Sequence, residues 1–167
     1  MPSPVRHLLI ATVVSLGSVA ALASDYPPVE VFAPKPCLAC IDWAEHLRDA
    51  GFAVKVTEVD DLPAIKRRLG VPKDLESVHT ATVAGYFVEG HVPAEDIKEL
   101  LKEKPRARGI AVPGTPIGAP GRENSNPFCE TACTMLDGEA KAQTVRRELF
   151  ETLLVDKQGK VSRWARH

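Results

Sequence analysis

The sequence has 167 residues, of which 44% are hydrophobic, and its 21 lysine and arginine residues are balanced by 22 aspartate and glutamate residues, for a formal net charge of −1. That length suits one domain with a substantial core. The charge balance argues against proteins that bind nucleic acid or an acidic membrane surface. The function must therefore be sought in short motifs.

The amino terminus has the pattern of an export signal. Arg6 and His7 precede an apolar stretch from Leu8 to Leu22, which ends in a small-x-small cleavage pattern. We expect a cleaved signal peptide over 1–23 and a single exported domain over 24–167, with no membrane contact after cleavage. The alternative is a membrane anchor, but the apolar stretch is shorter than the about 20 residues that a spanning helix needs.

The first part of this domain alternates between strand and helix patterns. The expected elements are strands at 29–32, 52–59, 80–87 and 87–91 and helices at 41–50, 62–69 and 93–104. Asp60 and Asp61 form the expected cap of the second helix, and Gly70 its end. No short turn dipeptide marks the boundary between the last two strands. A CxxC motif lies between the first strand and the first helix, which is the layout of an α/β, thioredoxin-like domain.

The second part of the domain departs from that layout. Residues 105–127 are rich in glycine and proline and predict a structured loop or an extended wrap. Residues 129–148 have a helical pattern, so that 105–148 form an insertion. Two apolar runs at 149–155 and 160–164 predict a terminal β-hairpin.

All four cysteines occur in two close pairs, Cys37 with Cys40 and Cys129 with Cys133. A disulfide between such near neighbours closes a tiny loop and stabilises a fold little, so close pairs suit redox exchange or metal binding better. Cys37 directly precedes the expected helix, where free N–H groups and the helix dipole favour a thiolate. That serves nucleophilic attack and metal ligation equally, and an inert local disulfide is a third alternative.

The spacing of Cys129 and Cys133 favours metal. On a helix, residues four apart have Cβ atoms about 5–6 Å apart, wider than the about 4 Å of a disulfide. The alternative is a pair of small buried hydrophobic residues. Four converging thiolates would select Cu(I), Zn(II) or an iron–sulfur cluster. Zinc prefers two CxxC-type motifs, and cluster assembly does not suit a chain exported unfolded, which leaves Cu(I) as the better fit.

Longer stretches of the chain resemble a known family. These are Val29-Glu30-Val31-Phe32, the CxxC, "WAEHLRDAGFAVKVTEVDDL", "KRRLGVPKDLESVHTATVAGYFVEGHVPAEDIKELLKEKP" and "GIAVPGTPIGAPG". Together they resemble exported, thioredoxin-like metal-binding proteins, and "NPFCETACTM" is similar to the CopG branch of periplasmic copper-resistance proteins. The resemblance implies a polynuclear copper–thiolate cluster held by Cys37, Cys40, Cys129 and Cys133, with a role in copper handling or Cu(I)/Cu(II) redox chemistry.

The chain departs from that family at two positions. Many relatives carry a Cys-x-Cys-Cys motif where this chain has Ala39 before Cys40, and many carry cysteine where this chain has Val78. Both departures lower the thiol count and make the second pair more important. His79, where redox enzymes of this layout have a cis-proline, and Met135 are candidate extra ligands. The alternatives are a hydrogen-bonded structural histidine and a core methionine.

Three readings of function remain open. The first is a copper-binding protein that exchanges copper with a periplasmic chaperone, oxidase or efflux component. The second is a thiol–disulfide oxidoreductase in which Cys37 attacks and Cys40 resolves the mixed disulfide. The third is a structural domain stapled by zinc. His46 and His91 are interpreted as surface or structural residues.

Overall fold

The structure is a computed structural model that describes residues 24–123 and 147–167. The expected signal peptide, the CxxxC motif and Met135 lie outside these residues. The described elements are β1 (Val29–Ala33), α1 (Leu38–Asp49), β2 (Val54–Glu58), α2 (Leu62–Leu69), a 3₁₀ turn (Lys73–Leu75), β3 (Thr80–Val83), β4 (Tyr86–Glu89), α3 (Ala94–Glu103), β5 (Ala107–Ala111), β6 (Glu151–Asp156) and β7 (Val161–Arg166). No helix within the described ranges is long and apolar enough to cross a bilayer.

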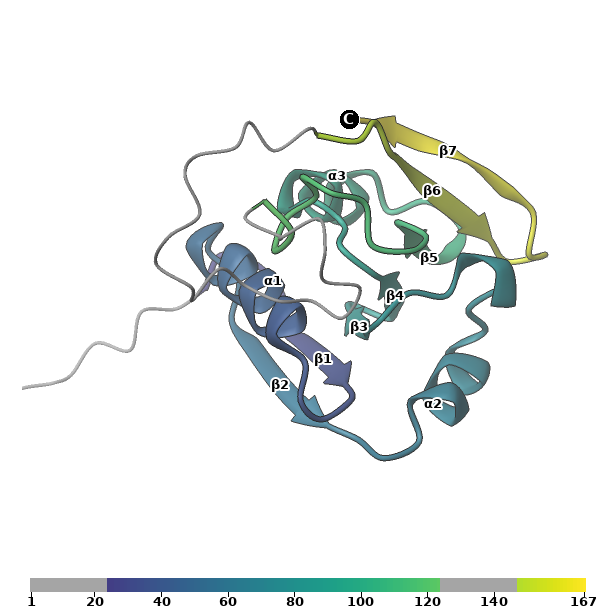
Figure 1. The fold of residues 1–167 in the computed structure, drawn as a ribbon. Helices are drawn as coiled ribbons and strands as arrows, with labels where there is room; N and C mark the ends of the chain where they lie inside the picture. Colours follow the sequence, from purple (N-terminus) through teal and green to yellow (C-terminus); the bar gives the residue numbers. More distant parts are fainter. Residues whose placement is uncertain (1–23, 124–146) are drawn as a thin grey trace, which may run out of the picture.

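The strands form one mixed sheet in the order β2-β1-β3-β4-β5-β6-β7 (Figure 1). β1 and β2 are parallel and joined through α1, and β4 and β5 are parallel and joined through α3. The remaining neighbours, β1 with β3, β3 with β4, β5 with β6 and β6 with β7, are antiparallel. The expected α/β class is therefore confirmed, and so is the terminal hairpin.

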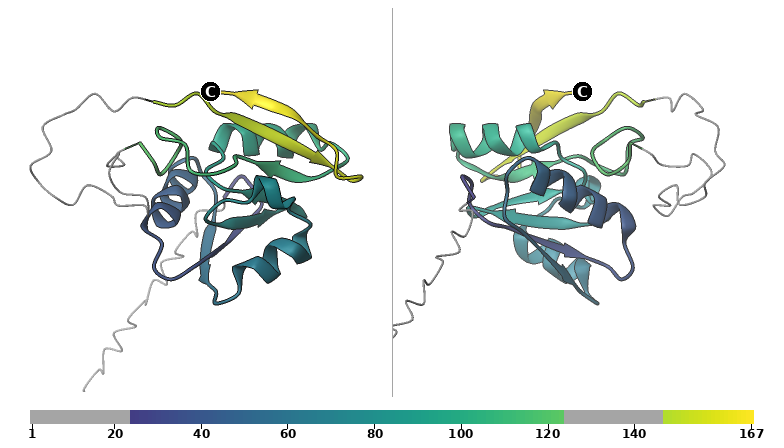
Figure 2. Two further views of the ribbon diagram at one scale, coloured as in Figure 1. Left: turned by 45° about the vertical axis from the view of Figure 1, so that its right-hand side comes forward. Right: turned by 90° about the vertical axis from the view of Figure 1, so that its left-hand side faces the viewer.

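Helices cover the sheet on both faces (Figure 2). Trp43 and Leu47 of α1 and Ile97 and Leu100 of α3 pack with one set of strand residues, which includes Val88. A second, smaller cluster forms on the other face, beneath the segment that follows α2; its members are Val71, Leu75, Phe87, Ala111 and Val155. Successive residues of β4 thus enter opposite clusters, because strand side chains alternate between the two faces of a sheet.

Two expected boundaries are wrong. β3 ends at Val83 and β4 begins at Tyr86, because Ala84 and Gly85 adopt φ values of 47° and 84° and make a tight turn. Two successive residues with positive φ match the twist of a hairpin, so Ala-Gly is the turn dipeptide. The second strand is also shorter than expected, spanning Val54–Glu58.

The expectation of a loop throughout 105–127 is also wrong. β5 occupies Ala107–Ala111 within it. Gly109 is required there for space, since a Cβ atom would lie 2.1 Å from the Phe87 carbonyl oxygen of the neighbouring strand. Of the expected helix at 129–148, only 147 and 148 are described, and they are not helical.

Candidate functional site

The first cysteine pair lies at the amino terminus of α1. Cys37 is the N-cap residue, is half-buried, and makes no capping hydrogen bond with its side chain. Cys40 is fully buried in the first turn. A disulfide joins the two, with Cα atoms 5.3 Å apart. Once reduced, Cys37 would face solvent at the positive end of a helix, which stabilises a thiolate.

His79 lies behind this pair, directly before β3. Its ring is fully buried, 4.4 Å from the ring of Trp43, which is one helical turn beyond Cys40. Trp43 is itself fixed by its indole N–H, which donates to the Val92 carbonyl at 2.8 Å. Neither nitrogen of His79 makes a hydrogen bond of normal geometry with the described residues, although the Gly90 backbone lies near enough to oppose part of the shift in its pKa. Burial lowers the pKa of His79 well below its usual value, and the electrostatic effects of His91 and Lys66 lower it further.

A second histidine stands against the first. The ring of His91 is 4.9 Å from that of His79, edge to face at 85°, and is fully buried. Its Nδ1 lies 2.9 Å from the Pro120 carbonyl oxygen, whereas its Nε2 has no partner among the described residues. Burial lowers the pKa of His91 to about 4. Of the two interpretations of His91, surface or structural, the surface one is wrong, because packing against the 112–122 loop removes the ring from solvent.

A buried ion pair on the other face of the sheet fixes the segment that carries His79. Lys66 of α2 contacts the Glu89 carboxylate and donates to the Thr80 hydroxyl at 2.8 Å. Glu89 also accepts from the Thr80 hydroxyl and the Ser77 amide, both at 2.5 Å. Burial raises the pKa of Glu89, and Lys66 opposes that shift. This network fixes the backbone on both sides of His79, because Ser77 precedes it and Thr80 follows it.

The loop over 112–122 brings the ends of the CxxxC segment to α1. Gly121 approaches the Ala39 carbonyl and the Trp43 amide so closely that a Cβ atom would lie 2.7–3.0 Å from them. After the undescribed residues, the chain returns to the same loop. The Glu148 amide donates to the Ile117 carbonyl, and the Ile117 amide donates to the Glu148 carboxylate, each at 2.9 Å. Glu123 therefore lies near α1, and Arg147 and Glu148 lie against the loop that covers it.

The other predicted residues have structural roles. His46 accepts the Ala94 amide at 3.1 Å through Nε2, and the Asp61 carboxylate accepts the Ala64 amide at 2.9 Å as the cap of α2. Cys129, Cys133 and Met135 lie outside the described residues. Within residues 24–123 and 147–167, no group of three or more His, Cys, Asp or Glu side chains is arranged to hold a metal ion.

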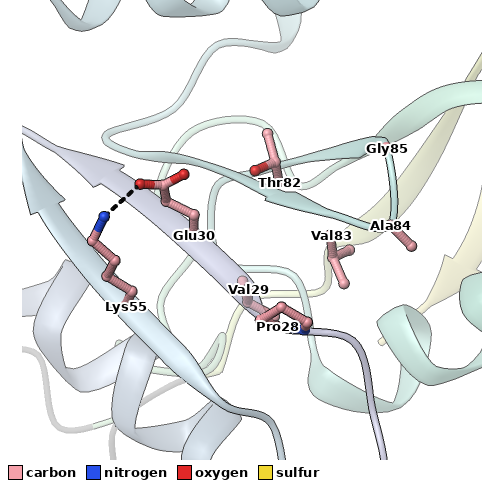
Figure 3. Close-up of a pocket in the computed structure, with 8 residues that line it drawn as sticks. All are labelled: Pro28, Val29, Glu30, Lys55, Thr82, Val83, Ala84 and Gly85. Atoms are coloured by element: carbon pink, nitrogen blue, oxygen red, sulfur yellow. Dashed lines mark hydrogen bonds and ion pairs between the residues drawn. The ribbon is translucent and has the colours of Figure 1, made fainter.

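A surface hollow of about 330 Å³ lies elsewhere, at the start of β1 and the β3–β4 turn (Figure 3). Its walls include Val29, Val83 and an ion pair between Glu30 and Lys55 at 3.1 Å. The cysteine pair follows the opposite end of β1. Because this hollow contains no sulfur or imidazole, it is separate from the candidate metal site.

Comparison with solved structures relates this arrangement to known proteins. Two structures entitled "Copper resistance protein copG", Form 1 and Form 2, are 34% and 33% identical to the chain, each with a TM-score of 0.70. Each match covers 86% of this chain and 98% or 99% of the other. The chain belongs to the CopG family. A family model described as "Protein of unknown function, DUF411" matches residues 75–122. A comparison with curated proteins finds no match.

Sequence reasoning missed two features of this CopG-family chain: the buried ion pair between Lys66 and Glu89, and the burial of His91. The ion pair was not predicted because lysine and glutamate are usually surface residues. The position of Lys66 on the apolar side of α2, between Leu62 and Leu69, was a signal of its burial. The burial of His91 was hidden because its cover comes from Pro120, distant in the sequence. A charged residue within a strand of otherwise apolar type, such as Glu89, is the available signal.

Proposed function

We propose that this CopG-family chain is a periplasmic copper-binding protein that acts in copper resistance. In this proposal Cys37, Cys40, Cys129 and Cys133 together hold a polynuclear Cu(I)–thiolate cluster. The observation that carries it is the relation to two copper-resistance proteins along nearly their whole length, combined with a CxxC at a helix amino terminus. The thioredoxin-like assignment, the signal peptide over 1–23 and the single domain over 24–167 are parts of the same proposal.

The length of chain between Glu123 and Cys129 is sufficient for the second cysteine pair to reach the first. Glu123 lies close enough to α1 to raise the pKa of Asp42, after the effect of burial. Only six residue steps separate Glu123 from Cys129, and six extended residues span about 20 Å. α1, with 12 residues, is about 18 Å long. The second pair therefore has enough chain to reach the first from this anchor.

The donor set suits copper. Thiolates are soft ligands that stabilise Cu(I), and the half-buried Cys37 gives an entering ion access. The disulfide between Cys37 and Cys40 is the oxidised form of the first cysteine pair. Two thiols could reduce two Cu(II) ions, giving the disulfide, two Cu(I) ions and two protons. That reaction would couple copper binding to Cu(I)/Cu(II) redox activity. Zinc is the less suitable metal, because the described residues already form two apolar clusters without a staple.

A thiol–disulfide oxidoreductase is the second candidate, favoured by the disulfide and by the exposure of Cys37 relative to Cys40. In that reaction Cys37 attacks a substrate disulfide and Cys40 releases it. The two proposals differ in what the second pair does. Loss of Cys37 alone would abolish disulfide exchange, and metal would inhibit it, whereas the copper proposal requires both pairs.

The deciding experiment is an anaerobic Cu(I) titration of reduced protein against a competing chelator. We expect more than one tightly held copper per chain, and a collapse of this number in both Cys37→Ser/Cys40→Ser and Cys129→Ser/Cys133→Ser. His167→Gln is the control that should keep the full number, since His167 follows β7 and contacts Asp96 of α3. One weakly held copper, unchanged by loss of the second pair, would contradict the cluster and favour the oxidoreductase. Partner chaperones, oxidases or efflux components can then be tested by copper transfer.

A further inference from the structure

Two fully buried histidines meet edge to face, and three of their nitrogen atoms make no hydrogen bond of normal geometry among the described residues: His79 Nδ1, His79 Nε2 and His91 Nε2. A buried polar atom without a partner costs about 1–3 kcal/mol. A phenylalanine at either position would fill a similar volume without that cost. The pair therefore indicates a ligand that imidazole nitrogens bind and a phenyl ring does not.

The hydrogen bond of His91 fixes which nitrogen is available. Pro120 offers only a carbonyl oxygen, so His91 Nδ1 must carry the proton and donate. His91 Nε2 then holds a lone pair with no donor among the described residues to meet it. Metal-binding histidines have this arrangement, in which the second ring nitrogen donates to a backbone carbonyl and fixes the tautomer. Trp43 holds the ring of His79 from the opposite side, 4.4 Å away.

We propose that His79 and His91 form a buried, sulfur-free site for one Cu(I) ion, bound between His91 Nε2 and one nitrogen of His79. Cu(I) accepts two neutral nitrogen ligands in line, so the pair needs no third residue. The choice of metal rests on the proposed function, but the site itself does not need the thiolate cluster. It lies next to Trp43, which is one helical turn beyond Cys40 on α1, and would hold copper that has passed the cysteines.

The charge around the rings favours a monovalent ion. Lys66 faces His79 but is paired with Glu89, and Arg122 faces His91. These cations oppose a divalent ion more than a monovalent one. No carboxylate is needed to balance the charge of Cu(I).

The ring geometry requires a small adjustment. A metal in line between two imidazole nitrogens, with bonds of about 2.0 Å each, places the ring centres about 6 Å apart. The present separation is 4.9 Å, with the rings edge to face. The rings must therefore separate by about 1 Å and turn into line. His91 is the ring able to move, since a loop carbonyl holds it, whereas Trp43 fixes His79.

The test is a nitrogen NMR titration of residues 24–167 labelled with ¹⁵N-histidine, reduced and anaerobic, with chelator-buffered Cu(I). We expect large shifts of His91 Nε2 and of one His79 nitrogen that saturate with one equivalent of copper beyond the copper held by the cysteines. His46 and His167 serve as internal references and should not move. If copper binds and the resonances of His79 and His91 stay in place, the imidazole site is wrong, while the thiolate proposal stands.

A variant with all four cysteines replaced by serine separates the two proposals. It should retain one chelator-resistant Cu(I), with the same two nitrogen shifts, and His79→Phe in that background should lose it. His46→Gln in the same background is the matched control and should keep the ion. Failure of the wild-type protein to bind several copper ions would contradict the cluster alone. Absence of any Cu(I) from the folded serine variant would overturn the imidazole site.

Discussion

Replacing Lys66 by methionine should destabilise the protein strongly, because it leaves the Glu89 carboxylate buried without its cation. The side chains of Lys66 and Glu89 are only 4% and 0% exposed. Methionine keeps the length and the apolar packing of the lysine stem while removing the charge. The substitution therefore tests the ion pair and leaves the surrounding core in place.

The expected loss in the free energy of unfolding is about 3–5 kcal/mol, the cost of breaking a buried pair by removing one partner. The free energy of unfolding of a domain is about 5–15 kcal/mol, so the substitution would remove a large fraction of the stability. Replacing both residues, as Lys66→Met/Glu89→Gln, should recover about 2 kcal/mol, because no buried charge is left uncompensated. The glutamine amide can still accept from the Ser77 amide, which now donates to Glu89 at 2.5 Å.

Urea unfolding of the metal-free protein with its disulfide intact measures these differences. A loss of about 4 kcal/mol moves the midpoint by about 2 M at a typical urea dependence. Lys35→Met is the control, since Lys35 pairs with Glu58 at 2.9 Å but the side chains are 75% and 54% exposed. Its midpoint should stay unchanged. A double variant as unstable as Lys66→Met alone would refute the reasoning that an uncompensated charge dominates.

Three further predictions concern stability. His91, with its pKa lowered to about 4 in the folded state, binds its proton more readily when unfolded, so lowering the pH from 7 to 5 should cost about 2 kcal/mol through this residue. His79, whose pKa burial also lowers, adds a loss of the same sign in both proteins. Urea midpoints across that range should therefore fall more steeply for wild type than for His91→Phe, and equal slopes would contradict the prediction. Asp61→Ala should cost about 1 kcal/mol through loss of the α2 cap, and Asp61→Asn should cost little; equal thermal midpoints for both would argue against the cap. Gly109→Ala should be far more damaging than Gly85→Ala, since its Cβ would lie 2.1 Å from the Phe87 carbonyl whereas Gly85 has open space. Circular dichroism on heating compares the two, and similar melting would show that β4 and β5 can separate.

Local patterns were sufficient to predict most of the fold. The CxxC before α1, the Asp61 cap and the terminal hairpin depend on neighbours in the sequence, and each is confirmed. β5 was missed because Gly109 and the prolines beyond it are typical of loops. Gly109 is in fact required by the Phe87 backbone of another strand, a contact that only the tertiary structure reveals.

The site was harder to predict than the fold. The sequence pointed to His79 through its position before the third strand, and the structure places it beside Trp43, behind the cysteine pair. His91 could not be recognised, because its burial depends on Pro120 in a distant loop. The convergence of the two cysteine pairs stays a prediction.

The two edge strands of the sheet affect whether the protein aggregates at high concentration. β2 and β7 stand at its edges, where free backbone groups can pair with strands of another molecule. Lys55 on β2 pairs with Glu30, and Arg163 and Arg166 on β7 pair with Glu151. Adding a foreign strand to either edge would crowd and desolvate these charges. The charged edge strands thus oppose the growth of intermolecular sheet, and with it aggregation, while the chain completes its fold.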